Sequence, residues 1–509
     1  MPARPARRLR SAAFAGALLS LIPGFANAQA LATPSPVAAT PPAPSAAPAG
    51  IPSELPSPTP QPSTTLPPAG VVPTDVTVDL GGTVSPAFAL ARIAATIAQQ
   101  AQLQGRAVPA VSGVSIPNAL QPGESLEALA QVTIPGGAGY APVAGVTSVH
   151  LTVETLDRLE PAFLLYSDDP ERLTAADDGV LFRSTVAQGR PVRLYAYHVS
   201  DTPDRHVSLV LQAAAGARVQ VLGYAAGPAD AFAYVGHVST LQYLLERGTQ
   251  ESSIVAIASG AAYLQQLGYR ALAPGELVAA IFDLRVLDGG PVEVDVIATS
   301  GTDDPLAHVR DPALPGDGHG RSGEFALGDV PPIAFTYAAG DPEPSPFPVG
   351  VPTIANVRPG GRPLGGDYGV IRSVQLQLSN AGGTPREVYF YEQAAGGTAT
   401  TTLWFSGDPR PTELPCVRGS ANRYLVKSIA LGANESNTVS GEYMTDGSSS
   451  FPLLFGVTSD PPSPPPGPYS PDACNPRPAP PAETPAPPAE TPSPPASPAA
   501  PEAGPSAAP

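Results

Sequence analysis

The chain has 509 residues, including 68 Pro and 50 Gly, so roughly a quarter of its positions interrupt regular helices and strands. Only 14% of the residues are charged and 42% are hydrophobic, which excludes a highly charged disordered polymer and a protein embedded in a membrane throughout. The formal net charge is -17, with 44 acidic against 27 basic residues, so we expect no binding to nucleic acid.

The first residues have the order of a secretory signal peptide. Four arginines between Arg4 and Arg10 precede an apolar stretch at Ala12–Ile22, and Ala26–Ala28 forms a small-residue cleavage site. We therefore expect residues 1–28 to be removed and the protein to be secreted, periplasmic or at the cell surface. No later run reaches the roughly 18 apolar residues of a membrane-spanning helix, so no transmembrane segment is expected after cleavage.

Two Pro-rich arms flank the part of the chain that can fold. Residues 29–74 and 461–509 consist largely of Pro, Ala, Ser and Thr, and Pro480–Pro485 is repeated at Pro487–Pro492. Such segments cannot bury a core, so both are predicted to be disordered spacers. Ligands for partner domains, or a segment that penetrates a cell wall, are the alternatives for the tail.

Cys416 and Cys474 are the two cysteines of the chain. In an exported protein, two cysteines are most simply explained by one disulfide, and two free thiols are the alternative. A bond between them would tie the tail to the last folded domain.

The first foldable segment, residues 75–142, is predicted to be an appendage of one strand and one helix. Ser85 is a helix N-cap, Pro86 occupies the first turn, and Gly105 ends the pattern. Leu90, Ile93, Ile97 and Ala101 form the apolar stripe. We expect this segment to dock on the domain that follows, because it has little apolar material for a core.

Residues 143–305 are predicted to form a first β-sandwich, because apolar residues alternate with polar ones in short runs separated by Gly, Pro and Asp. The runs are Val149–Val153, Phe163–Tyr166, Val180–Phe182, Val192–His198, Val207–Leu211, Val219–Leu222, Leu277–Val286 and Val292–Ile297. One helix, at about Ala231–Glu246, interrupts them.

Residues 346–460 are predicted to form a second sandwich after a polar linker at 306–345. On its first strand Ile371, Ser373, Gln375 and Gln377 share one face, and Asn380–Gly383 is a hairpin signal. The remaining strands are Val388–Tyr391, Thr400–Phe405, Tyr424–Leu431, Val439–Met444 and Leu453–Val457. The predicted fold class is mainly β, with two tandem immunoglobulin-like β-sandwiches.

Three short segments give a resemblance to a group of uncharacterised secreted bacterial proteins with tandem β-sandwiches. They are Phe163–Ser167, His319–Arg321 and Asp367–Val370. The resemblance implies an exported β architecture and no particular site.

The linker holds the densest set of polar side chains. Asp317, His319 and Arg321 are candidates for a metal or anion site, and a flexible or domain-bridging loop is the preferred interpretation. The glycine spacing from Gly318 to Gly323 matches a dinucleotide-binding pattern, but its surroundings lack the strand and helix which that pattern requires.

Paired acids occur at Asp168–Asp169, Asp177–Asp178 and Asp303–Asp304. Extracellular modules bind Ca²⁺ weakly through such loops, but adjacent aspartates do not supply ligands at alternating positions. Capping of turns is the better explanation, so we expect no cofactor, with weak Ca²⁺ binding as the alternative.

Aromatic side chains suggest a binding face on the first sandwich. Arg193, Tyr195 and Tyr197 share one face of their strand, where tyrosine rings stack on sugars and the guanidinium donates hydrogen bonds. Packing of these tyrosines beneath the helix or against the neighbouring domain is the preferred alternative. Trp404 is expected in a core.

The chain contains no nucleophile elbow, phosphate-binding loop or zinc-protease helix motif. We therefore expect a non-catalytic protein of the cell surface or envelope, with a structural, adhesive or glycan-binding role. Its expected partners are cell-envelope polysaccharide or a surface protein. An extracellular hydrolase that uses carboxylates on the sandwich loops is the alternative.

Overall fold

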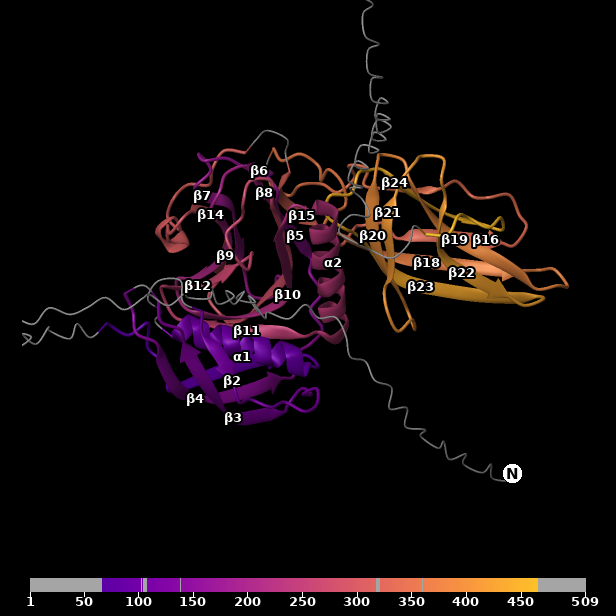
Figure 1. The fold of residues 1–509 in the computed structure, drawn as a ribbon. Coiled ribbons are helices and arrows are strands. Elements are labelled where there is room, and N and C mark those ends of the chain that lie inside the picture. The colour runs from indigo at the N-terminus through magenta and orange to yellow at the C-terminus, as the bar shows by residue number, and fades with distance from the viewer. Residues whose placement is uncertain are drawn as a thin grey trace, which may run out of the picture. The chain divides into compact units, whose positions relative to one another are not determined.

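The computed structural model describes residues 66–101, 103, 108–137, 139–316, 321–358 and 360–465 (Figure 1). The predicted signal peptide, most of both Pro-rich arms, Asp317, His319 and Cys474 lie outside these ranges. The inner ends of both arms are described. Ala69 is buried and its N–H donates to the carbonyl of Ala141, while the N–H of Ser463 donates to the carbonyl of Arg423.

The described residues form four β-sheets and two α-helices, which confirms the predicted mainly β fold with two sandwiches. The largest sheet has the strand order β15-β5-β8-β13-β10-β11-β1-β4-β3-β2, with β6 paired to β8. The others have the orders β12-β9-β14-β7, β16-β18-β23-β20-β21 and β17-β24-β19-β22.

The N-terminal segment has a hydrophobic core of its own. It comprises β1 (Asp75–Gly81), α1 (Pro86–Gln100), β2 (Ala110–Ser112), β3 (Ser125–Ile134) and β4 (Val143–Glu154). The Ser85 hydroxyl accepts a hydrogen bond from the N–H of Phe88, as its predicted role as N-cap requires. The apolar stripe differs in one position, because Ala89 is buried and Leu90 is exposed.

The sequence pattern predicts β4 as part of the first sandwich and predicts no strand at β3. In the structure β4 lies between β3 and β1, and valines, leucines and Ile134 of these strands form a hydrophobic cluster with α1. The segment therefore has more apolar material than its first strand and helix suggested.

The first sandwich encloses a core between the β5-to-β11 part of the large sheet and the β12-β9-β14-β7 sheet. Its strands are β5 (Phe163–Ser167), β6 (Arg172–Leu173), β7 (Gly179–Val186), β8 (Val192–Ser200), β9 (Arg205–Ala213), β10 (Ala217–Ala229), β11 (Ser252–Ile257), β12 (Ala261–Gln266), β13 (Leu277–Gly289) and β14 (Val292–Ser300). The helix α2 (Phe232–Thr249) follows β10 and packs on β10 and β13.

The predicted linker contributes a strand to each sandwich. After the short 3₁₀ helix η1 (Pro305–Ala307), β15 (Ser322–Ala326) pairs with β5, and β16 (Ile333–Ala338) pairs with β18. This segment bridges the two sandwiches as an ordered part of both.

The second sandwich consists of β16, β17 (Phe347–Val349), β18 (Ile371–Asn380), β19 (Arg386–Ala394), β20 (Ala399–Phe405), β21 (Thr412–Val417), β22 (Tyr424–Leu431), β23 (Glu435–Thr445) and β24 (Leu453–Thr458). The predicted hairpin at Asn380–Gly383 is wrong, because β18 and β19 belong to different sheets. The Asn380 side chain instead donates hydrogen bonds to the carbonyls of Thr384 and Gly432, where the chain passes from one sheet to the other.

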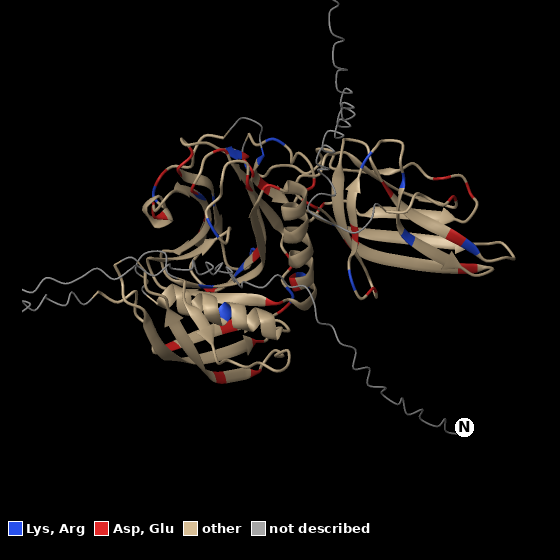
Figure 2. Cartoon of the chain, in the orientation of Figure 1, with Lys and Arg blue, Asp and Glu red and all other residues tan. Residues whose placement is uncertain are grey.

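Charged residues of both signs are scattered along the described chain (Figure 2). Among the described residues, neither helix is both long and apolar enough to span a membrane.

Candidate functional site

The predicted aromatic face on β8 is buried. The exposed fractions of Arg193, Tyr195 and Tyr197 are 2%, 1% and 6%. Tyr195 and Tyr197 belong to a hydrophobic cluster formed with α2 and the second sandwich. The prediction of an accessible ligand-binding face is therefore wrong, and the alternative of packing against the helix and the neighbouring domain describes the structure.

Arg193 is held by a buried ion pair. Its Nε lies 2.8 Å from Oδ1 of Asp283, and Nη1 donates to the carbonyl of Gly369 at 3.0 Å. The Tyr243 hydroxyl on α2 also donates to Asp283, at 2.8 Å. Through the ion pair and the hydrogen bond to Gly369, the Arg193 guanidinium connects β8 to β13 and to the second sandwich.

The tyrosines form a stack rather than a binding platform. Tyr195 lies between Tyr166 and Tyr197, with ring centroids 5.3 and 6.5 Å away, and Tyr368 stacks on it at 6.0 Å. The hydroxyls of Tyr197 and Ser448 are hydrogen-bonded at 2.5 Å. No ring face of Tyr195 remains available for a sugar.

The candidate metal or anion residues are described only in part. Arg321 forms ion pairs with Asp168 and Glu171, so its guanidinium is engaged with carboxylates. Within the described ranges, no group of three or more His, Cys, Asp and Glu side chains is arranged to hold a metal ion.

Two of the paired acids that were predicted to cap turns, Asp177–Asp178 and Asp303–Asp304, accept hydrogen bonds within turns. Asp177 accepts hydrogen bonds from the N–H and the hydroxyl of Thr174, both at 2.7 Å. Asp304 accepts from the N–H of Leu306 at the start of η1.

Cys416 is a buried, disulfide-bonded residue of β21. Cys474, which the sequence predicts as its partner, lies outside the described residues.

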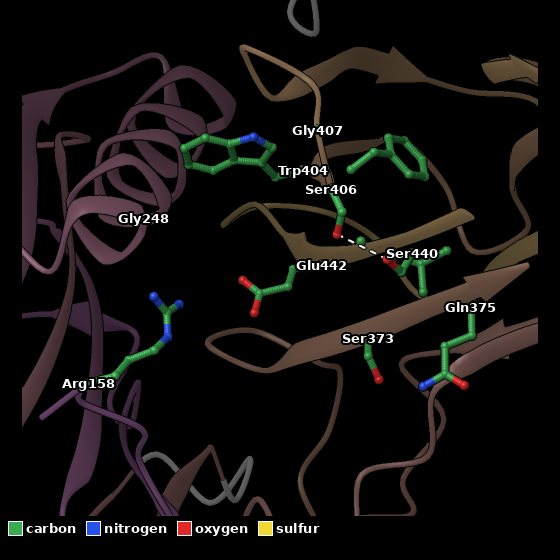
Figure 3. Close-up of a pocket in the computed structure, with 12 residues that line it drawn as sticks. Arg158, Gly248, Ser373, Gln375, Trp404, Ser406, Gly407, Ser440 and Glu442 are labelled. Carbon is green, nitrogen blue, oxygen red and sulfur yellow. Dashed lines mark hydrogen bonds between the residues drawn. The ribbon is translucent and has the colours of Figure 1, made fainter. Parts of the chain in front are cut away.

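A groove of about 410 Å³ lies on the second sandwich, where the outer face of its five-stranded sheet meets the end of α2 (Figure 3). Its lining comes from β18, β23 and β20, from Gly248 of α2, and from Arg158 in the loop after β4. This volume falls within the usual range for small-molecule sites.

Strand alternation places the polar side chains of the groove on the outer face of the sheet. Leu403 and Phe405 point into the core of the sandwich, so Trp404 between them points outward. Ser373 and Gln375 share one face of β18, as the sequence predicted, and both are exposed.

Trp404 is therefore not the core residue that was expected. It is half-buried, and its Nε1 donates to the carbonyl of Asp408 at 3.1 Å. Its six-membered ring packs on Gly248, where a Cβ atom would lie 2.9 Å from two indole carbons (Figure 3). Glycine at 248 thus allows the indole to lie directly against α2 at one end of the groove.

The charged residues of the groove are paired within the protein. Arg158 bonds Glu160 at 2.6 Å, and the Glu442 carboxylate lies 3.1 Å from Nη2 of Arg247 on α2. The remaining polar lining consists of hydroxyl and amide groups, of which Ser440 and Ser406 are hydrogen-bonded at 3.0 Å.

A buried polar cluster fixes α2, which forms the wall of the groove, to the second sandwich. Nδ1 of His237 lies 2.7 Å from Asp446, and Nε2 lies 2.8 Å from Glu413. Burial disfavours the charged ring, but the two carboxylates outweigh it and raise the pKa of His237 to about 9. The imidazole is therefore protonated at neutral pH and bridges two domains.

A buried glutamate, Glu392, lies in the core of the second sandwich. Glu392 faces inward on β19, and its only hydrogen bond among the described residues comes from the Thr401 hydroxyl at 2.6 Å. Burial, together with the nearby Asp446 carboxylate, raises the pKa of Glu392 to about 8. It is therefore largely a neutral carboxylic acid at pH 7.

No protein-family model matches the chain, and no curated protein matches it. Among solved structures, similarity is found to tripeptidyl peptidase 2 (9% identity, 67% of this chain and 26% of that chain, TM-score 0.14). Similarity is also found to Lac15 from a marine microbial metagenome (12% identity, 68% of this chain and 76% of that chain, TM-score 0.10). A third similarity is to the tandem CBM22 domains of Paenibacillus barcinonensis Xyn10C, with 8% identity over 56% of this chain and 99% of that chain and a TM-score of 0.12. The chain spans about a quarter of the length of the peptidase, and TM-scores of this size carry no function over.

Among the described residues, the lining of the groove contains few titratable side chains. Glu442 is the one carboxylate in its described lining, whereas glycoside hydrolysis by acid–base pairs needs two. His237, which lies on α2 outside the groove lining, has both ring nitrogens hydrogen-bonded to carboxylates, so it has no free nitrogen to accept a proton. Alternation on β20 is the signal that identifies Trp404 as an outward-facing residue from sequence.

Proposed function

We propose that the protein is an exported, non-catalytic protein of the cell surface or envelope that binds glycans in the groove on its second sandwich. The supporting observation is a fixed indole, Trp404, next to hydroxyl and amide side chains on an exposed sheet face. Sugars combine apolar ring faces, which stack on indoles, with hydroxyls that both donate and accept hydrogen bonds.

The rigidity of the groove supports this function. Its floor is a paired sheet, and its wall is joined to that sheet by Arg247–Glu442 and by the His237 cluster. Side chains that are held in place before binding lose little conformational entropy when the ligand arrives.

The test is retention of the full-length protein on isolated cell envelope and on a panel of polysaccharides, with released sugars assayed in the same tubes. We expect retention without product, and loss of retention in Trp404→Ala. Tyr269 is 64% exposed and lies outside the groove lining, so Tyr269→Ala is the matched control and should be retained.

Three results would overturn the proposal. Retention that survives Trp404→Ala would place binding outside the groove. Sugar release that disappears in Glu442→Gln would make the protein a hydrolase, whereas no retention on any glycan would favour a structural or adhesive role with a surface protein.

A further inference from the structure

The exposed face around the groove carries three rows of side chains that cross the strands. The strand register aligns Ser373, Glu442 and Trp404 in a wall row, which lies beside α2. It aligns Ala334, Gln375 and Ser440 in a middle row, extended by Ser406. It aligns Thr336, Gln377 and Thr438 in an outer row.

The wall row marks the edge of the accessible face. One pair further along the strands, Met444 is buried opposite Ile371, and both pack against the first sandwich. A ligand on this face is therefore confined on one side by α2 and Arg158. The open direction runs along the rows, from β20 towards β16.

The charge of the face argues against an anionic ligand. The three rows contain no Lys or Arg, and their one ionisable residue is the acidic Glu442. The nearby Arg158 and Arg247 are already paired with carboxylates, and the chain as a whole carries -17. An anion on the rows would meet the Glu442 carboxylate, while the nearby guanidinium groups already have carboxylate partners.

We infer that the ligand is a linear, uncharged polysaccharide that lies across β20, β23, β18 and β16, along the wall and middle rows; this inference rests on the proposed glycan-binding function. One sugar stacks on Trp404, and the following sugars exchange hydrogen bonds with Ser440 and Gln375, whose groups both donate and accept. Strands are about 4.8 Å apart, so the path over four strands is about 14 Å long and holds several sugar units. Ala334 at its far end leaves room for the chain to continue.

The test uses the full-length protein with neutral polymers (β-glucan, mannan and xylan), anionic polymers (alginate and polygalacturonate), and an oligosaccharide series cut from the neutral polymer that is retained. Calorimetry should show affinity rising with chain length until the oligosaccharide spans four strands. Gln375→Ala should weaken the longest oligosaccharide by about threefold to tenfold, as expected for one lost hydrogen bond, and leave the shortest unchanged. Gln131→Ala, an exposed glutamine on β3, is the matched control and should change neither.

The outcomes separate this inference from the proposed function. If affinity depends on Trp404 but not on chain length or Gln375, the groove binds a single terminal sugar, and the linear path is refuted while glycan binding stands. Preferential retention on alginate or polygalacturonate would refute the uncharged ligand. If no polymer is retained, the inference and the proposed function fail together.

Discussion

Replacing Glu392 with Gln should remove much of the alkaline sensitivity of the second sandwich. In the folded protein this buried carboxyl group has a pKa of about 8, whereas the ordinary pKa of a glutamate side chain is 4.5. Because the folded state holds the proton more tightly, the contribution of Glu392 is fully present below pH 4.5 and is lost as the pH rises through about 8. Each pH unit in that window costs about 1.4 kcal/mol, so the whole window corresponds to about 5 kcal/mol.

The assay is urea unfolding followed by tryptophan fluorescence between pH 5 and pH 9. Trp404 is the only tryptophan of the chain and lies on β20, so its emission reports on the second sandwich. We expect the variant and the wild type to have similar unfolding free energies at pH 5, and the variant to be more stable by several kcal/mol at pH 9. Glu387→Gln, at an exposed position of the same strand, should follow the wild type.

Parallel pH curves for the wild type and Glu392→Gln would refute the reasoning. That result would mean that Glu392 ionises in the folded state as easily as in the unfolded chain, through water or a cation that reaches the core. A lower stability of the variant at every pH would instead indicate that the amide does not fit the site.

Gly248→Ala should displace Trp404, since a Cβ atom would come within 2.9 Å of the indole; we expect a shifted fluorescence emission and weaker glycan binding with unchanged circular dichroism. His237→Gln should destabilise the protein by about 3 kcal/mol at pH 6, and the difference should shrink as the pH rises through about 9, because the raised pKa of His237 stabilises the fold only while the ring is protonated; urea unfolding at pH 6 and 9.5 measures this. Arg193→Leu should cost about 3–5 kcal/mol in the same assay because it leaves the buried Asp283 carboxylate without its ion-pair partner, and the double replacement with Asp283→Leu should recover part of the loss.

Period-two alternation made the floor of the groove predictable. Ser373, Gln375 and Gln377 were assigned to one face of their strand, and all three are exposed in the structure. The same rule applied to Leu403 and Phe405 would have turned Trp404 outward. The expectation of a core position for Trp404 is therefore wrong, and the positions of its neighbours carry more information than its side-chain type.

The misassigned aromatic face on β8 has a different cause. Alternation correctly separates Tyr195 and Tyr197 from Val192, Leu194 and Ala196, and these two sets belong to different hydrophobic clusters. It does not indicate what covers each side. The cover comes from α2 and from the second sandwich, which are distant in sequence, so only the tertiary structure shows that β8 is buried on both faces.

The segment from β15 to β16 limits how far the two sandwiches can move apart. Each of its strands is hydrogen-bonded into a different sandwich, and only residues 327–332 connect them. A connection of this length reaches about 20 Å when fully extended, so larger separations require one strand to be peeled from its sheet. Under a pulling force, the backbone hydrogen bonds of β15 and β16 would bear the load once this short connection is extended. A fragment that ends at residue 305 would lack β15 of the first sandwich, and a fragment that begins at residue 346 would lack β16 of the second.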